Sequence, residues 1–179
     1  MALQIPTLAT RRLLDITPAM LRAMGVRAVL LDVDNTLSHH GAPIPFDGSI
    51  QWVKEMEKSG FQLIIVSNNT KERITPFARQ FDLPFIWRAC KPLPIGYWKA
   101  AKHLGVRHKE TVIIGDQIYT DVVGANLIGM RSILVEPAEE EHGWSFRVRR
   151  HFEKSVRRRI HARGIYYAPG ETERGESAQ

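Results

Sequence analysis

The sequence predicts an α/β fold in which a parallel five-stranded sheet carries helices on both faces. Strand-sized apolar runs alternate with helix-like segments along the chain, and this order is typical of parallel strands joined by crossover helices. The two longest apolar runs, Ala28–Leu31 and Leu63–Val66, are continuous rather than alternating between apolar and polar residues. Continuous runs indicate strands that are covered on both faces, so we expect three layers.

The individual elements follow from capping residues and apolar runs. Thr17 offers an N-cap hydroxyl and is followed by proline, which predicts a helix over residues 17–24 that Gly25 ends. Later helices also end at glycines, and short apolar runs separate them. In chain order we expect a strand at 28–32, a helix at 49–58, a strand at 63–67, a helix at 71–81, a strand at 85–87, a helix at 95–104, a strand at 112–115, a helix at 121–128 and a strand at 132–135.

Charge divides the chain of 179 residues, which is too short for two ordinary domains. Residues 1–142 carry 16 basic and 15 acidic side chains, whereas residues 143–164 carry eight basic ones and only Glu153. We therefore predict a main domain over residues 1–142, which includes the helix at 17–24, and a basic helical appendage over residues 143–164. The Gly- and Glu-rich end, residues 165–179, is predicted to be a disordered tail.

The composition also limits the compartments in which we expect the protein to function. Cys90 is the single cysteine, which excludes an intrachain disulfide and a cysteine metal cluster. Every apolar run is far shorter than the ~20 residues of a transmembrane segment, and the N-terminus lacks the charged-then-apolar pattern of a secretory signal. We interpret the protein as cytoplasmic, with peripheral contact with a membrane left open as an alternative.

Chemically useful side chains stand where the predicted strands end, and in an open parallel sheet ligands bind at those ends. A carboxylate there can form an aspartyl phosphate, and magnesium prefers carboxylate oxygens. A lysine and a hydroxyl can neutralise the charge on phosphoryl oxygens. The residues in question are Asp32 and Asp34 after the first strand, Ser67 and Asn68 after the second, Lys91 after the third, and Asp116 and Asp121 after the fourth.

Four segments resemble, in order, the four motifs of the haloacid-dehalogenase (HAD) superfamily of phosphatases. They are Asp32-Val33-Asp34-Asn35-Thr36, Ser67, Lys91-Pro92 and Gly115-Asp116-Gln117-Ile118-Tyr119-Thr120-Asp121. Residues 66–69 and 115–121 look like the capless IIIA subgroup. Residues 14–18 resemble the YqeG-type branch, which is related to mitochondrial and plastid phosphatidylglycerophosphate phosphatases. The match spans residues 28–121 and implies a three-layer α/β/α, Rossmann-like core.

The resemblance implies a Mg²⁺-dependent phosphatase in which Asp32 attacks phosphorus and becomes a phosphoaspartate. Asp34 would protonate the leaving alcohol and later deprotonate the hydrolytic water, and an acid at this position selects phosphate-ester hydrolysis within the superfamily. Magnesium would be held by the carboxylates of Asp32 and Asp116 and by the backbone carbonyl of Asp34. Asp121 would orient Lys91 or a metal-bound water.

The same resemblance assigns the substrate-binding residues. Ser67 would hydrogen-bond the phosphoryl group, and Lys91 would pair with both that group and the nucleophile. Thr36 and Asn68 complete the predicted set, although a turn-building role for the Asn68 side chain is equally open. We interpret Arg73 as part of an exposed helix face, with substrate contact as the alternative.

Spacing between the motifs predicts an open site without a cap domain. Only 34 residues separate Asp32 from Ser67, and only 23 separate Ser67 from Lys91. A helix and a strand use up each interval, so neither has room for an inserted domain. An open site suits a large substrate, a polymer or a headgroup at a surface.

The basic appendage has one apolar stripe, formed by Val148, Phe152, Val156 and Ile160 at four-residue spacing. Three hypotheses remain open for residues 146–163. The helix binds an anionic membrane surface, it binds nucleic acid through phosphates, or its stripe packs on the main domain and its charges are solvated. The segment lacks interleaved aromatic residues for base stacking, which makes nucleic acid the weaker partner.

These observations favour a phosphomonoesterase whose best-guess substrate is phosphatidylglycerophosphate, a phospholipid headgroup ester. The alternative substrates are small sugar or nucleotide phosphates and phosphoproteins. A second hypothesis is a non-catalytic RNA- or ribosome-associated binding protein on the same fold. The acid at Asp34 counts against it, because a binding module does not need that residue.

Overall fold

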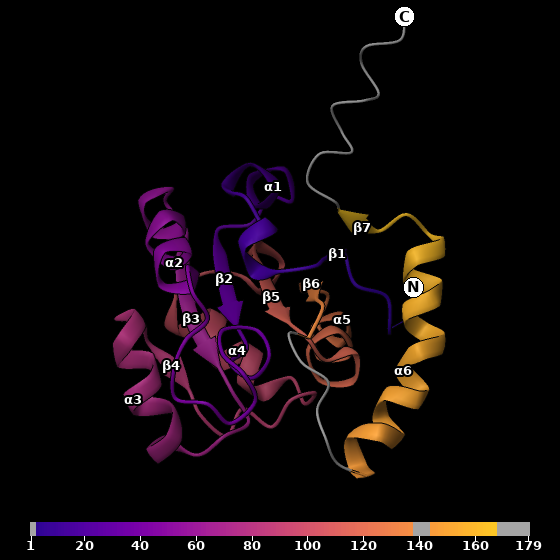
Figure 1. Cartoon of the computed structure of the whole chain (residues 1–179). Helices are drawn as coiled ribbons and strands as arrows, with labels where there is room; N and C mark the ends of the chain where they lie inside the picture. The colour runs from indigo at the N-terminus through magenta and orange to yellow at the C-terminus, as the bar shows by residue number, and fades with distance from the viewer. Residues whose placement is uncertain (1–2, 138–143, 168–179) are drawn as a thin grey trace, which may run out of the picture.

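The computed structural model describes residues 3–137 and 144–167. In these ranges, all strands are parallel and join in one sheet with the order β4-β3-β2-β5-β6-β1-β7 (Figure 1). The strands are β1 (Leu8–Thr10), β2 (Ala28–Leu31), β3 (Gln62–Val66), β4 (Phe85–Ile86), β5 (Thr111–Gly115), β6 (Arg131–Val135) and β7 (Tyr166–Tyr167).

The five predicted strands, β2 to β6, are confirmed, and β1 and β7 extend the sheet at one edge. Our expectation that residues 165–179 are disordered is wrong for Tyr166–Tyr167, which pair with β1. The N–H of Ala9 also donates to the carbonyl of Ile165 at 3.1 Å. Strands this short show no periodic pattern, and β1 and β7, unlike the equally short β4, do not lie between two predicted helices, so the sequence does not predict them. Residues 168–179 of the predicted tail lie outside the described residues.

Helices connect the strands, and two kinds of shorter helical turn accompany them. The α-helices are α1 (Pro18–Ala23), α2 (Ser49–Lys58), α3 (Lys71–Phe81), α4 (Ile95–His103), α5 (Val123–Leu127) and α6 (Trp144–Ala162). The 3₁₀ turns are Leu13–Asp15 and His108–Glu110, and a π-helical turn, Ile118–Val122, leads into α5. The helix predicted at 121–128 therefore begins earlier, in this π-helical turn.

Alternating strand residues face opposite sides of the sheet, and each side has its own helices. Val29 and Leu31 of β2 belong to a cluster with buried residues of α1, α2 and α3. Leu30 belongs instead to a cluster with Tyr97 of α4 and Ala125 of α5. This arrangement confirms the predicted α/β/α layers (Figure 1).

Helix α6 packs on the edge of the domain where β1 and β6 pair. Val156 is 2% exposed and Ile160 is fully buried, in a cluster with residues of β1, β6 and the π-helical turn. Val156 and Ile160, the two stripe residues whose side chains are described, therefore pack on the main domain, as the third hypothesis for this segment requires. The side chains of Val148 and Phe152 lie outside the described residues. Among the described helices, α6 included, none has both the length and the apolar character that crossing a bilayer requires.

Two stretches of the chain could hold an inserted cap domain that covers the carboxyl ends of the strands. Between Asp32 and Ser67 the chain forms a loop, α2 and β3, and between Ser67 and Lys91 it forms α3 and β4. Within residues 3–137 and 144–167, no cap domain interrupts the core, which confirms the prediction from spacing.

Candidate active site

The carboxyl ends of neighbouring strands bring most of the predicted site residues together. Asp32 follows β2, Asp116 follows β5, and Ser67 follows β3, and these three strands are neighbours in the sheet. All three side chains are buried, with at most 5% exposure. The parallel register therefore gathers residues that lie far apart in the sequence.

Lys91 bridges two of the buried carboxylates. Its Nζ lies 2.8 Å from Asp32 Oδ1 and 2.6 Å from Asp121 Oδ1. Burial alone would lower the pKa of Lys91, but the charges of Asp121 and Asp32 outweigh burial and raise it. Lys91 is therefore a permanent cation beside the predicted nucleophile.

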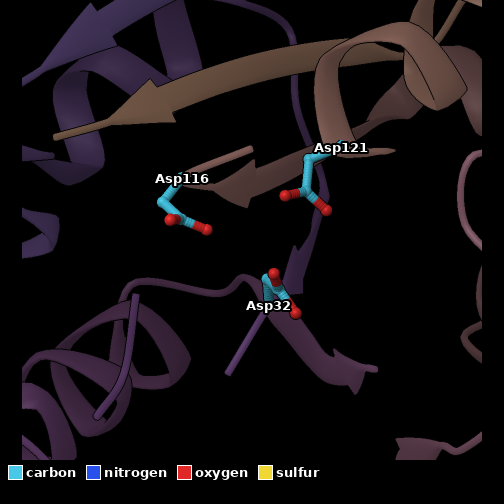
Figure 2. A group of neighbouring side chains, drawn as sticks. All are labelled: Asp32, Asp116 and Asp121. Carbon is cyan, nitrogen blue, oxygen red and sulfur yellow. The ribbon is translucent and has the colours of Figure 1, made fainter. Parts of the chain in front are cut away.

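Asp32, Asp116 and Asp121 form a carboxylate cluster that fits a divalent cation. Each offers one oxygen, and these atoms lie within 4.8 Å of one another, with the carboxylates converging as Figure 2 shows. Hard cations such as Mg²⁺ prefer oxygen ligands of this kind. Burial raises the pKa of Asp32 to about 7, although Lys91 lowers it, and the charge of Asp121 adds to the rise. Three buried carboxylates exceed the single charge of Lys91, so a further cation would balance the cluster.

The structure groups these acids differently from the sequence analysis. Asp32 and Asp116 come together as expected, and Asp121, predicted to orient Lys91 or a water, adds a third carboxylate to the cluster. Asp121 also bonds Lys91. Its carboxylate rests against Gly115, where any added Cβ would collide with it. Glycine before Asp116 thus makes room for Asp121.

The loop after β2 presents Asn35 and Thr36 to the site. Asn35 has a left-handed backbone with φ +57°, a conformation that Asn tolerates better than most residues. Its Nδ2 donates to Asp116 Oδ2 at 3.3 Å. The Thr36 hydroxyl is buried and, within the described ranges, makes no hydrogen bond. It is therefore available to a ligand.

The second strand end presents Ser67 and Asn68, which play different parts. The Ser67 hydroxyl oxygen accepts the N–H of Asn69 at 3.2 Å. The Asn68 side chain accepts the N–H of Lys91 at 2.7 Å and donates to the Lys91 carbonyl at 3.1 Å. The structure thus favours the turn-building alternative for the Asn68 side chain, which fixes the backbone of Lys91.

The carboxylate of Asp34 is not part of the acidic cluster and faces α3 instead. Arg73 Nη2 lies 2.6 Å from Asp34 Oδ1, and Asn69 Nδ2 donates to Oδ2 at 2.8 Å. The N–H of Gly41 donates to Oδ1 at 2.9 Å, and His40 Nδ1 lies 3.6 Å from the same oxygen.

Our interpretation of Arg73 as part of an exposed helix face is therefore wrong. Arg73 lies in the first turn of α3, directly after the loop that follows β3. Its position at a strand's carboxyl end was the available signal, because that edge of the sheet is where side chains meet ligands.

Comparisons with known proteins agree with this geometry. A family model described as HAD-hydrolase-like matches residues 89–146, which include Lys91, Asp116 and Asp121. The Bacillus subtilis protein named "Probable phosphatase YqeG" is 34% identical over 156 residues, which cover 87% of this chain and 88% of that one.

Solved structures share the fold at low sequence identity. The 4-nitrophenylphosphatase of Thermotoga maritima matches with a TM-score of 0.55 and 12% identity, over 66% of this chain and 88% of its own. The cobalt-bound deoxy-D-mannose-octulosonate 8-phosphate phosphatase of Haemophilus influenzae matches with a TM-score of 0.51 and 16% identity, over 63% of this chain and 69% of its own.

Proposed function

Because the chain belongs to the YqeG-type phosphatases of the HAD superfamily, we propose that it is a magnesium-dependent phosphomonoesterase with Asp32 as its nucleophile. That it is a HAD-type phosphatase follows from 34% identity over 87% of the chain. The observation that carries the proposed mechanism is the buried lysine, Lys91, held between Asp32 and Asp121 at the strand ends.

In the first step, an Asp32 oxygen attacks phosphorus, and the bond from phosphorus to the leaving alcohol breaks. Asp34 gives its proton to the departing oxygen. Lys91 and Ser67 stabilise the charge on the phosphoryl oxygens, and the Thr36 hydroxyl is the further donor that the site offers. The products are the alcohol and a phosphoaspartate.

In the second step, water attacks the phosphoaspartate and regenerates Asp32. Asp34, now ionised, takes the proton from that water, and inorganic phosphate leaves. Magnesium, held by Asp32, Asp116 and the carbonyl of Asp34, would supply positive charge at the phosphoryl group. Asp121 keeps Lys91 in place beside Asp32.

The best-guess substrate is phosphatidylglycerophosphate, which would place the enzyme in phosphatidylglycerol synthesis. A cavity of about 810 Å³ borders Asn35 and Thr36, and its walls include the apolar side chains of Leu13, Leu14 and Phe46. A cavity of this size lies in the range of small-molecule sites. The cavity offers space for a bulky leaving group, which supports a large phosphate ester as the substrate over a very small one.

We further propose that α6 holds the enzyme at an anionic membrane surface from the cytoplasmic side. Lys154, Arg158, Arg159 and Arg163 are exposed, while Val156 and Ile160 face the domain. Since Val156 and Ile160 are buried, the contact would be electrostatic, at about 1 kcal/mol per cation near the surface. It should therefore weaken as salt concentration rises.

The nucleophile is tested by Asp32→Asn, which preserves the shape of the side chain. We expect Mg²⁺-dependent hydrolysis of 4-nitrophenyl phosphate to fall at least 1,000-fold, on the order of what losing a covalent nucleophile costs, while circular dichroism stays unchanged. Turnover within tenfold of the wild type would refute Asp32 as the nucleophile.

The substrate is tested by phosphate release from vesicles that contain phosphatidylglycerophosphate, beside soluble sugar and nucleotide phosphates. Lys154→Glu/Arg158→Glu should slow the vesicle reaction while leaving 4-nitrophenyl phosphate hydrolysis unchanged. Lys99→Glu/Lys102→Glu, a matched pair of exposed lysines on α4, is the control for net charge. Faster turnover of the soluble esters, with no effect of the α6 variant on vesicles, would exclude the lipid substrate.

A further inference from the structure

Helix α6 reaches the loop that carries Asp116 and bonds its backbone at two points. Arg157 Nη2 donates to the carbonyl of Asp116 at 2.9 Å. Glu153 Oε1 accepts the N–H of Ile118 at 3.3 Å. The two side chains are also joined, because Arg157 Nη2 lies 3.4 Å from Glu153 Oε2.

Both bonded groups lie in the short stretch between β5 and the π-helical turn. Asp116 directly follows the last residue of β5. The N–H of Ile118 belongs to the first turn of the π-helical segment, where a helical chain has no acceptor of its own. A buried loop needs partners for such groups, and α6 supplies two of them.

Stability alone does not explain the Glu153–Arg157 pair. Glu153 is the single acidic residue among residues 143–164 and is only 5% exposed. It lies three residues before Val156 and seven before Ile160, so it shares their buried face. Burying an ion pair contributes little net stability, and an apolar residue there would often pack better. What the pair adds is two directed hydrogen bonds to the Asp116 loop.

The loop is consequently held by two sets of bonds. In the first, Lys91 bonds Asp121, and Asp121 Oδ2 accepts the N–H of Gln117 at 3.3 Å. In the second, the α6 pair bonds the residues immediately before and after Gln117. Both sets hold the backbone that carries the Asp116 carboxylate.

We infer that Glu153 and Arg157 are positioning residues of the metal site, which hold Asp116 in its ligating orientation from the C-terminal helix. The inference rests on the proposed function, because it needs a divalent cation at Asp32 and Asp116. It makes α6 a component of the catalytic centre as well as a cationic surface. Removing α6 should therefore impair hydrolysis of soluble esters too, so a deletion cannot by itself test membrane binding.

The test compares Arg157→Ala with Arg158→Ala in the full-length chain. Arg158 is the exposed neighbour, so its loss removes the same charge without touching the loop. Mg²⁺ binding is measured by calorimetry and by the shift of Tm with Mg²⁺, and hydrolysis of 4-nitrophenyl phosphate is measured against Mg²⁺ concentration. We expect Arg157→Ala to raise the Kd for Mg²⁺ about tenfold, in the range that outer partners of metal ligands contribute. Arg158→Ala should stay within twofold of the wild type.

Charge-preserving variants separate positioning from general stability. Arg157→Lys should recover part of the Mg²⁺ affinity, because its ammonium can still donate to the Asp116 carbonyl. If Arg157→Ala does not fold, the pair Arg157→Lys and Arg158→Lys takes over the comparison, and a several-fold weaker Mg²⁺ affinity is expected only for the former.

Equal Mg²⁺ affinity in the Arg157 and Arg158 variants, at whatever Tm, would overturn the inference while leaving the proposed function intact. A wild-type protein that binds no divalent cation would overturn the proposed metal site, and the inference with it.

Discussion

At the scale of single residues, the buried charges around Lys91 determine how the site responds to protons and to metal. Lys91 contacts Asp32 and Asp121 and remains charged, because those carboxylates raise its pKa despite burial. Asp32 is affected in the opposite sense, since burial raises its pKa to about 7 and so favours its neutral form. Protons and a divalent cation therefore compete for Asp32.

This competition predicts how the metal-free protein depends on pH. The pKa of Asp32 in the folded state, about 7, lies above its ordinary value of 3.8. The stabilising effect of the bound proton is therefore complete below about pH 4 and is lost as pH rises through 7. In chelator, Tm of the wild type should fall relative to Asp32→Asn between pH 5 and pH 8, and Mg²⁺ should restore it at pH 8. A constant difference in Tm across this range would contradict the prediction.

Arg73 gives a second prediction at the same scale, because it holds the proposed acid. Arg73→Ala removes the 2.6 Å contact with Asp34 and leaves that carboxylate less well placed to protonate a leaving group. Aryl phosphates have good leaving groups and depend little on that proton, whereas alkyl phosphates depend on it strongly. We expect kcat to fall about 10-fold or more for glycerol phosphate and less than threefold for 4-nitrophenyl phosphate.

Arg79→Ala is the control for this substitution, since Arg79 is an exposed arginine on the same helix. It should leave both reactions unchanged. An equal loss for the two substrates in Arg73→Ala would mean that Arg73 does not act through Asp34.

At the scale of elements, the described side chains of α6 that hold it to the domain include Val156, Ile160 and the Glu153–Arg157 pair. Ile160 is fully buried, so Ile160→Ala should lower the free energy of unfolding by about 2–4 kcal/mol. Urea denaturation followed by circular dichroism measures this loss. Ile44→Ala, at a side chain that is 73% exposed, should change stability by less than about 0.5 kcal/mol. Equal losses in the two variants would show that α6 is not anchored through Ile160.

The elements also show which features a sequence can predict. Strands β2 to β6 are predictable because mostly apolar runs alternate with predicted helices, and this alternation identifies even the two-residue β4. β1 and β7 lie outside that alternation, and two or three residues carry no period of their own. The burial of Glu153 could have been predicted, since an acidic residue on the apolar face of a helix indicates a buried polar partner. The identity of that partner, the N–H of Ile118, depends on how α6 docks.

At the scale of the whole molecule, the sequence predicts which site residues stand at strand ends. It does not predict the contacts that loop residues make with them. The parallel sheet brings Asp32, Lys91 and Asp116 together, and their order along the chain already predicts this. The contacts of Asp34 with Arg73, Asn69 and Gly41 depend instead on the paths of the loops that follow β2 and β3. No periodic pattern encodes such a path.

The position of β1 has a consequence for biosynthesis. Leu8–Thr10 pair with residues 133–135 on one side and 166–167 on the other, so this strand leaves the ribosome long before its partners exist. Such distant pairing slows folding, and domains generally fold as units during synthesis. If α6 positions the metal loop, the growing chain also lacks Glu153 and Arg157 while its catalytic aspartates are already made. A nascent chain would then hold every catalytic residue and still bind Mg²⁺ more weakly until residues 153–167 dock.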